Sequence, residues 1–190
     1  NSVSLMFTQQ DFKREKGSTM PELPEVETIK RTLEALVIGK QIEDVEVYWP
    51  KIIKRPDDID EFKVLLKGQT IRSMDRRGKF ILFYLDDITL VSHLRMEGKF
   101  GVFPKDEPIA KHTHVIFSFT DGTQLRYNDV RKFGTMHVFP KGEEKNYPPL
   151  NQLGPEPFSE EFTVSYFEKA IGKTTRNIKA VLLDQTIVTG

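Results

Sequence analysis

A succession of short apolar runs separated by turns occupies residues 42–139 and most strongly limits what this chain can fold into. Each run has the length of a β-strand, and several alternate apolar with polar residues. The runs cover residues 42–49, 71–75, 80–85, 89–93, 115–119, 124–127 and 134–139. The dipeptide Asp121-Gly122 between two of them is typical of a type I′ hairpin turn. Short strands with tight turns indicate a two-sheet antiparallel β-sandwich.

Two helices are predicted beside these strands. Pro24 suits the first turn of a helix, acidic residues follow it there, and Gly39 suits the position after the helix ends. Apolar residues recur between them at helical spacing, so the sequence predicts a helix over 24–38 and a shorter one over 58–66. The expected fold class is therefore α+β, with the N-terminal helix packed on the sandwich.

The chain divides into four parts. Residues 1–19 are polar and show neither helical nor strand periodicity. The run KREKG over 13–17 can be encoded by purines alone, as in a ribosome-binding site, so we expect an untranslated leader and a true start at Met20; a disordered tail or a tag is the alternative. Residues 20–141 form the sandwich domain, 142–160 a proline-rich linker, and 161–190 the start of a helical domain, with helices over 162–171 and 177–184.

Composition excludes several classes of function. The chain has no cysteine, so disulfides, thiolate zinc ligands and thiol nucleophiles are excluded. It has no apolar stretch of membrane-spanning length and no signal-peptide pattern, so we expect no membrane partner and a cytoplasmic location.

The net charge is +0, but the positions of the charges are uneven. Basic residues recur between residues 72 and 132, where they form either a phosphate-binding face or ordinary solvated strand edges. They are Arg72, Arg76, Arg77, Lys79, Arg95, Lys99, Lys111, Arg126, Arg131 and Lys132.

Pro21 and Glu22 suggest covalent chemistry if the chain begins at Pro21. An N-terminal proline is a secondary amine, and part of it is neutral near physiological pH. A neutral amine can attack a sugar C1′, expel the base and leave a cationic iminium that favours elimination of phosphate. Glu22 could supply acid–base chemistry at the sugar. By themselves, both residues are also ordinary punctuation at a helix start.

The segment at 20–28 (MPELPEVET) resembles the start of bacterial formamidopyrimidine-DNA glycosylases, the Fpg/MutM family. Further segments agree with that family in the same order, and together they cover the chain from Met20 to Gly190. They are 76–80 (RRGKF), 92–98 (SHLRMEG), 111–114 (KHTH), 126–134 (RYNDVRKFG), 153–157 (LGPEP) and 177–185 (NIKAVLLDQ). Leu23 favours this branch over the related endonuclease VIII branch, which usually has glycine there.

The resemblance implies three catalytic residues. Pro21 would be the Schiff-base nucleophile, Glu22 the general acid/base, and Lys79 a catalytic lysine that assists elimination. It also implies a set of DNA-contacting residues. Of these, Met96, Arg131 and Phe133 would fill the void left by an extruded base, and His112 would contact DNA, while His114 would support its loop. Lys173 and Arg176, at the entry to the last predicted helix, either contact phosphates or are ordinary surface residues.

The implied function is a bifunctional DNA glycosylase/AP lyase of base excision repair. It would remove 8-oxoguanine and formamidopyrimidines from damaged double-stranded DNA and then cleave the strand by β/δ-elimination. A monomer acting near the bacterial nucleoid is expected. The alternatives are a non-enzymatic nucleic-acid-binding module and an endonuclease VIII-like glycosylase for oxidised pyrimidines.

The sequence departs from the family pattern at both ends. With residues 1–19 attached, the nitrogen of Pro21 belongs to an amide and cannot act as a nucleophile. Family members also continue into a helix–two-turn–helix unit and a four-cysteine zinc finger. We therefore expect the chain as given to be an inactive fragment without a cofactor, and the one structural zinc to belong to that finger.

Overall fold

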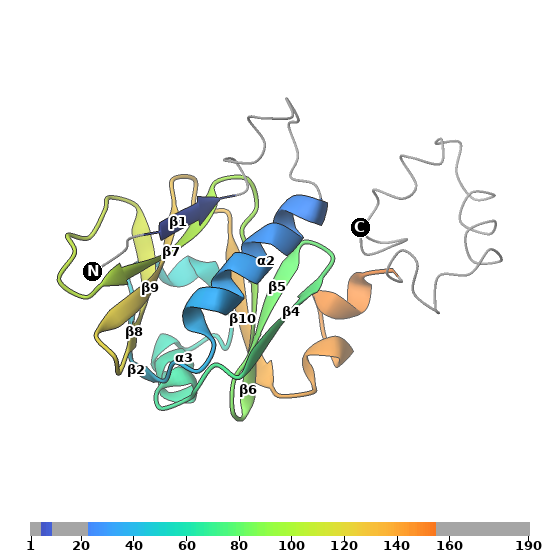
Figure 1. Ribbon diagram of the computed structural model, residues 1–190. Coiled ribbons are helices and arrows are strands. Elements are labelled where there is room, and N and C mark those ends of the chain that lie inside the picture. Colours follow the sequence, from blue (N-terminus) through green and yellow to red (C-terminus); the bar gives the residue numbers. More distant parts are fainter. Residues whose placement is uncertain (1–4, 9–22, 155–190) are drawn as a thin grey trace.

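Two five-stranded sheets form the centre of the molecule in the computed structural model, which describes residues 5–8 and 23–154 (Figure 1). The strands of the first sheet are, in spatial order, β1 (Leu5–Thr8), β7 (Gly98–Pro104), β9 (Thr123–Asp129), β8 (Thr113–Phe119) and β2 (Ile42–Val47). Those of the second are β3 (Ile53–Arg55), β10 (Thr135–Pro140), β6 (Ile88–His93), β5 (Phe80–Tyr84) and β4 (Ser73–Arg77). The predicted α+β sandwich is confirmed.

The pairing within the sheets is antiparallel with one exception. The short strand β3 runs parallel to β10, so the second sheet is mixed rather than purely antiparallel. Neither β3 nor β7 is among the predicted strands. β3 has only three residues, and β7 contains two glycines and ends in proline, which lowers its strand propensity.

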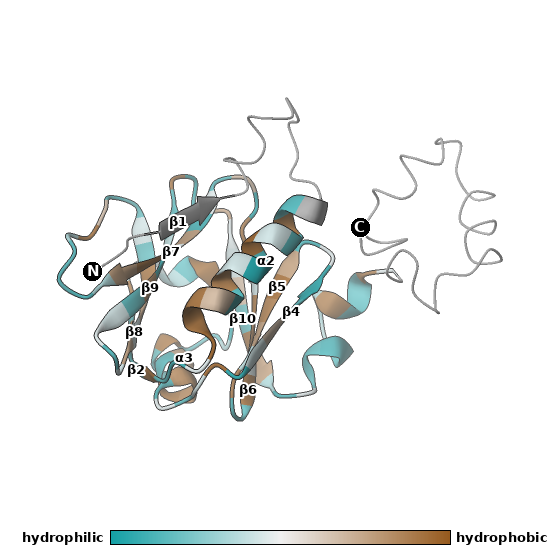
Figure 2. Ribbon diagram, viewed as in Figure 1, coloured by the Kyte–Doolittle hydropathy of each residue, from teal (hydrophilic) through white to brown (hydrophobic). Residues whose placement is uncertain are grey.

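Helix α2 (Leu23–Val37) packs against β4 and β5 (Figure 1). Its buried stripe consists of Val26, Ile29, Leu33 and Val37, one residue for each turn of the helix. Figure 2 shows the apolar character of β5 beside it. The helix begins and ends within one residue of the predicted bounds. The second predicted helix is also present, as α3 (Ile59–Leu66), with the side chain of Asp58 capping its N-terminus.

The core between the sheets is rich in aromatic side chains. Phe83 of the second sheet meets Phe100 of the first edge to face, with 5.7 Å between ring centroids. Phe100 in turn packs on Tyr127 at 5.3 Å. These contacts bury large apolar surfaces from both sheets and fix the distance between them.

A smaller cluster lies on the other side of the second sheet. Leu150 packs there with Phe80, Leu82, Val91 and Phe139. Leu150 belongs to the second of two 3-10 helices, η2 (Glu144–Asn146) and η3 (Leu150–Gln152). The described part of the predicted 142–160 linker is therefore packed on the sandwich domain. A third short helix, η1 (Pro50–Ile52), precedes β3.

Two local expectations differ from the structure. Residues 5–8 form β1 and pair antiparallel with β7, although the sequence indicates no strand within 1–19. The type I′ prediction for Asp121-Gly122 is wrong. Within this fully described turn only Gly122 has a positive φ, of 86°, and its N–H donates to Phe119 O at 3.3 Å. This is the pattern of a turn followed by a glycine bulge.

The helices predicted over 162–171 and 177–184 lie outside the described residues. Neither α2 nor α3 has the length and apolar character that crossing a membrane would require.

Candidate functional site

Four loops meet at one end of the sandwich because of the strand register. Phe80, at the start of β5 beside the β4–β5 hairpin, pairs with His93 at the end of β6, and Thr135 of β10 pairs with His93 on its other side. In the first sheet, Gly98 pairs with Asp129, and the start of β8 pairs with the end of β9. The β4–β5 hairpin, the 94–97 turn, the 130–134 loop and the turn before β8 are therefore neighbours.

Lys79 follows Gly78 in the β4–β5 hairpin, and only 8% of its surface is exposed. His93 lies close to it, since its ring meets Phe80 edge to face at 4.8 Å. Burial, together with the positive charges of Arg95 and Lys79, lowers the pKa of His93 to about 3. His93 Nδ1 accepts a hydrogen bond from the Arg95 N–H at 2.9 Å, which leaves the proton of the neutral ring on Nε2. The site thus combines a buried amine with a neutral imidazole donor.

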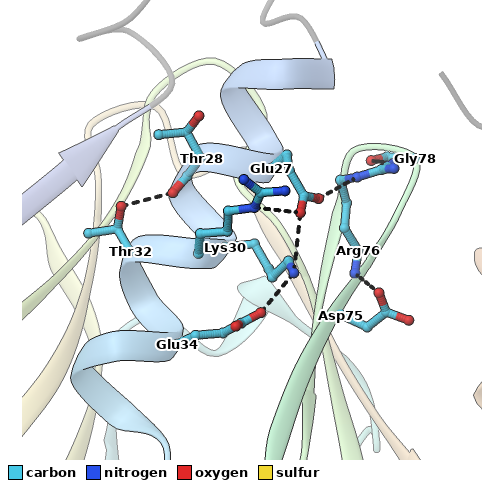
Figure 3. A network of polar contacts seen from close by, with 9 residues as sticks. Glu27, Thr28, Lys30, Thr32, Glu34, Asp75, Arg76 and Gly78 are labelled. Atoms are coloured by element: carbon cyan, nitrogen blue, oxygen red, sulfur yellow. Dashed lines mark hydrogen bonds and ion pairs between the residues drawn. The ribbon is translucent and has the colours of Figure 1, made fainter.

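An ion-pair network fixes helix α2 against this hairpin (Figure 3). Arg76 Nε lies 3.0 Å from Glu27 Oε2, and Arg76 Nη1 donates to Gly78 O at 3.0 Å. Lys30 Nζ lies 3.3 Å from the other oxygen of Glu27. Burial raises the pKa of Glu27, but hydrogen bonds from Lys30 and Arg76 outweigh it, so that the pKa is lowered. The first turns of α2 are thereby held beside Lys79.

The 130–134 loop presents its side chains to solvent. Phe133 is 62% exposed, and Arg131 is also exposed. Arg131 Nε lies 3.8 Å from Glu97 Oε1 in the 94–97 turn, which also carries the half-buried Met96. The three predicted void-filling residues therefore lie on two loops joined by an ion pair.

Lys132 lies between these two exposed side chains and turns back to the domain. Its φ is 61°, in the left-handed region that few lysines adopt. Its ammonium lies 3.7 Å from the centroid of the Trp49 ring. This cation–π contact anchors the outer side of the loop.

The two histidines before and within β8 have different roles. His112 has a φ of 69° and a half-buried side chain, and its carbonyl accepts the Asp129 N–H at 3.0 Å. His114 is buried and its Nε2 lies 2.7 Å from Asp129 O. His114 thus supports the segment that leads into the 130–134 loop, as predicted, whereas His112 remains partly accessible.

The basic residues do not all belong to one face. The guanidinium of Arg126 is buried and donates to Glu107 O at 2.8 Å and Pro108 O at 3.2 Å. Burial lowers its pKa. Arg126 therefore braces the 105–110 segment and does not contribute to an exposed basic face.

Four predicted site residues, Pro21, Glu22, Lys173 and Arg176, lie outside the described residues. Within residues 5–8 and 23–154, no three side chains of the metal-binding types are placed to hold a metal ion together. His93, Glu97 and Trp49 had no predicted role. Two of them lie inside the 92–98 segment, but only the folded chain shows what each one contacts.

A family model described as the formamidopyrimidine-DNA glycosylase N-terminal domain matches residues 20–136. The chain is 65% identical over 171 residues to the formamidopyrimidine-DNA glycosylase of Halalkalibacterium halodurans, covering 90% of this chain and 62% of that protein. Identity to the enzyme of the same name from Oceanobacillus iheyensis is 61%, with 90% and 61% covered. The chain therefore spans about three fifths of the length of these relatives.

Solved structures agree in fold. A formamidopyrimidine-DNA glycosylase of Lactococcus lactis, bound non-covalently to DNA containing an AP site, is 40% identical with a TM-score of 0.80, covering 89% of this chain and 64% of that one. A second structure from the same organism, in complex with FAPY-dG containing DNA, gives a TM-score of 0.79 at 40% identity, covering 89% of this chain and 63% of that one.

Proposed function

Because this chain belongs to the formamidopyrimidine-DNA glycosylase family, we propose that it provides the catalytic domain of a DNA glycosylase of base excision repair. The observation that carries the proposal is the meeting of four loops at one end of the sandwich. They bring the buried Lys79 beside a neutral His93, next to a loop that exposes Arg131 and Phe133. A buried amine suits chemistry at a sugar, and the exposed loop suits a distorted duplex.

The partner is damaged double-stranded DNA, and the substrates are 8-oxoguanine and formamidopyrimidines. An enzyme that acts on a base within a duplex must first extrude it and support the stack that remains. Phe133 and Met96 supply apolar surface for that void, and the planar donors of Arg131 suit the edge of the orphaned base. His112, Lys173 and Arg176 contact the phosphate backbone. One solved relative holds DNA containing an AP site and another holds FAPY-dG containing DNA, which supports damaged DNA as the partner.

The reaction begins at the nitrogen of Pro21. Its lone pair forms a bond to C1′ while the bond from C1′ to the base breaks, and the base leaves with that electron pair and a proton. Glu22 provides acid–base catalysis. The proline nitrogen then loses its proton, and its lone pair breaks the C1′–O4′ bond, while O4′ takes up a proton; this opens the sugar and gives the iminium. The iminium withdraws electrons, so loss of a C2′ proton expels the 3′-phosphate in β-elimination, and a further δ-elimination expels the 5′-phosphate. Lys79 assists these steps. Attack requires a free amine, since an amide nitrogen has no available lone pair.

The zinc expected from the family is not assigned to residues of this chain. The chain has no cysteine, so its own side chains do not fit a four-cysteine site, and no step above uses a metal. We also propose that the protein is cytoplasmic and acts as a monomer.

Borohydride trapping tests the enzyme directly. A protein that begins at Pro21 and extends over the full length of its relatives should form a covalent adduct with an 8-oxoguanine duplex. The matched control is the same protein with residues 1–19 retained, and we expect no adduct from it or from the 190-residue chain. If the protein beginning at Pro21 binds the duplex but gives no adduct, it is a binding module. Preferential trapping on oxidised pyrimidines would instead indicate the endonuclease VIII-like activity.

A further inference from the structure

A single buried carboxylate holds both ends of the 130–134 loop. Asp129 is fully buried at the end of β9. Its Oδ2 accepts the Gly134 N–H at 2.8 Å, and its Oδ1 accepts the Arg131 N–H at 3.2 Å. The segment between these two amides carries the exposed Arg131 and Phe133 side chains. The position of the loop therefore depends on hydrogen bonds that its backbone N–H groups donate to the carboxylate of Asp129.

Tyr127 adds a third bond to the same carboxylate and touches a second loop. Its hydroxyl donates to Asp129 Oδ2 at 2.8 Å. A Cβ placed on Gly134 would lie 1.6 Å from the Tyr127 oxygen, and one placed on Gly98 would lie 2.7 Å from it. Gly98 ends the turn that carries Met96. The phenol oxygen is thus wedged between the two loops, each of which approaches it at a glycine.

The hydroxyl remains a donor throughout the ordinary pH range. Burial, together with the neighbouring charge of Asp129, raises the pKa of Tyr127 above its usual value. The hydrogen bond from the Tyr127 hydroxyl to the carboxylate therefore does not depend on ionisation of the phenol at ordinary pH.

The outer contacts of the same loops are weaker. The pair between Arg131 and Glu97 spans 3.8 Å, and 60% of the Arg131 side chain is exposed. Such a surface pair is easily exchanged for a phosphate or a base edge. The buried bonds of Asp129 face no such exchange, so the loop backbone can keep its position while the side chains change partners.

We propose that Tyr127 and Asp129 are positioning residues that hold the 94–97 turn and the 130–134 loop at a fixed separation. Met96 of the turn and Arg131 and Phe133 of the loop can then enter together the void that an extruded base leaves in the duplex. This inference rests on the proposed function. It assigns a role to two buried side chains that do not touch the substrate.

Two substitutions separate the contributions. Both carboxylate oxygens of Asp129 accept a backbone N–H, and a backbone N–H can only donate. In Asp129→Asn one of the two oxygens becomes an NH₂ group, so in either orientation of the amide one N–H faces another donor and loses its hydrogen bond. Tyr127→Phe removes only the hydroxyl and keeps the ring that packs on Phe100. The matched control is Asp121→Asn. Asp121 also accepts a backbone N–H, from Thr123 at 2.9 Å, but at the opposite end of the first sheet.

Amide hydrogen exchange measures the position of the loops directly. In Asp129→Asn we expect exchange in 94–98 and 130–134 to accelerate about tenfold, as loss of one such bond predicts, with β5 and α2 unchanged. Tyr127→Phe should show a smaller change at the same amides and serves alone if Asp129→Asn does not fold. Asp121→Asn should leave both loops as they are. Acceleration spread evenly over the domain, or none at the loops, would overturn the proposal.

DNA binding provides a readout that a merely structural role would not change. The variants should lose affinity for a duplex with an abasic-site analogue but keep their affinity for an intact duplex. For Asp129→Asn the affinity for the abasic duplex, divided by that for the intact duplex, should fall about tenfold. An unchanged ratio together with accelerated loop exchange would contradict the positioning role. If the unsubstituted protein, beginning at Pro21 and extended over the full length of its relatives, has no preference for the abasic duplex, the proposed function fails, and loop exchange alone decides whether the two residues hold the loops.

Discussion

Replacing His93 by asparagine should make the stability of the fold less sensitive to acid. His93 is 6% exposed and neutral, with a pKa of about 3 in place of the ordinary 6.5. Between these two values the unfolded chain binds a proton that the folded chain does not. Stability therefore falls as the pH drops below 6.5, and the loss levels off only near the folded pKa.

The size of the effect follows from the two pKa values. Each pH unit in that window costs about 1.4 kcal/mol, so going from about pH 7 to about pH 5 costs roughly 2 kcal/mol through His93 alone. Asparagine cannot titrate, but its Oδ1 can accept the Arg95 N–H that His93 Nδ1 accepts at 2.9 Å. The variant removes the proton site while keeping this bond.

Urea unfolding of both proteins at the two pH values measures this difference. His137, whose pKa is lowered to about 4 mainly by burial, adds acid sensitivity in the same window, but it is present in both proteins and cancels. The gap between the two free energies of unfolding should change by roughly 2 kcal/mol between the two conditions. Parallel losses in the two proteins would refute the assignment of His93 as a buried neutral histidine.

Three further experiments test the packing of the site and the conformation of one distant turn. Gly134→Ala should lower the free energy of unfolding by about 3 kcal/mol, because the new Cβ would lie 1.6 Å from the buried Tyr127 oxygen; a loss below about 1 kcal/mol in urea unfolding would contradict that close approach. A double-mutant cycle that replaces Glu27 and Arg76 by glutamine should give a coupling free energy of about 0.5–1 kcal/mol, because the two groups are 3.0 Å apart but partly exposed. High salt should reduce this coupling, and zero coupling would show that the ion pair does not fix α2. Gly122→Ala should cost about 1 kcal/mol in thermal unfolding, because φ is 86° there, and an unchanged midpoint would argue against the strained turn.

Local sequence patterns were sufficient for much of the fold. The α2 stripe repeats once for each turn and identifies the helix, and Pro24 and Gly39 mark its ends, so its bounds follow from the sequence within one residue. The turn at Asp121-Gly122 shows the limit of such reasoning. The dipeptide suits two kinds of turn, and the register of β8 against β9 selects between them.

Motifs in the sequence identify several residues of the site, but they do not set how exposed each residue is. Met96, His112, Arg131 and Phe133 were identified from motifs, and the structure places all four in loops at one end of the sandwich. Composition and periodicity do not distinguish the exposure of Arg126, buried under a loop, from that of Arg131, exposed on another. Both arginines lie in one motif, and only the packing of neighbouring segments sets their exposure.

The sequence by itself determined the α+β class, the first helix, most strands and the family, because periodicity and motifs are properties of neighbouring residues. The tertiary structure alone decided that His93 is neutral, that Tyr127 is wedged between two loops, and that Asp129 joins both ends of one of them. The hydrogen bonds of Asp129 join residues only two to five positions apart, but the burial of Asp129, Tyr127 and His93 depends on atoms from segments far apart in the chain. These properties therefore exist only once the two sheets have packed together.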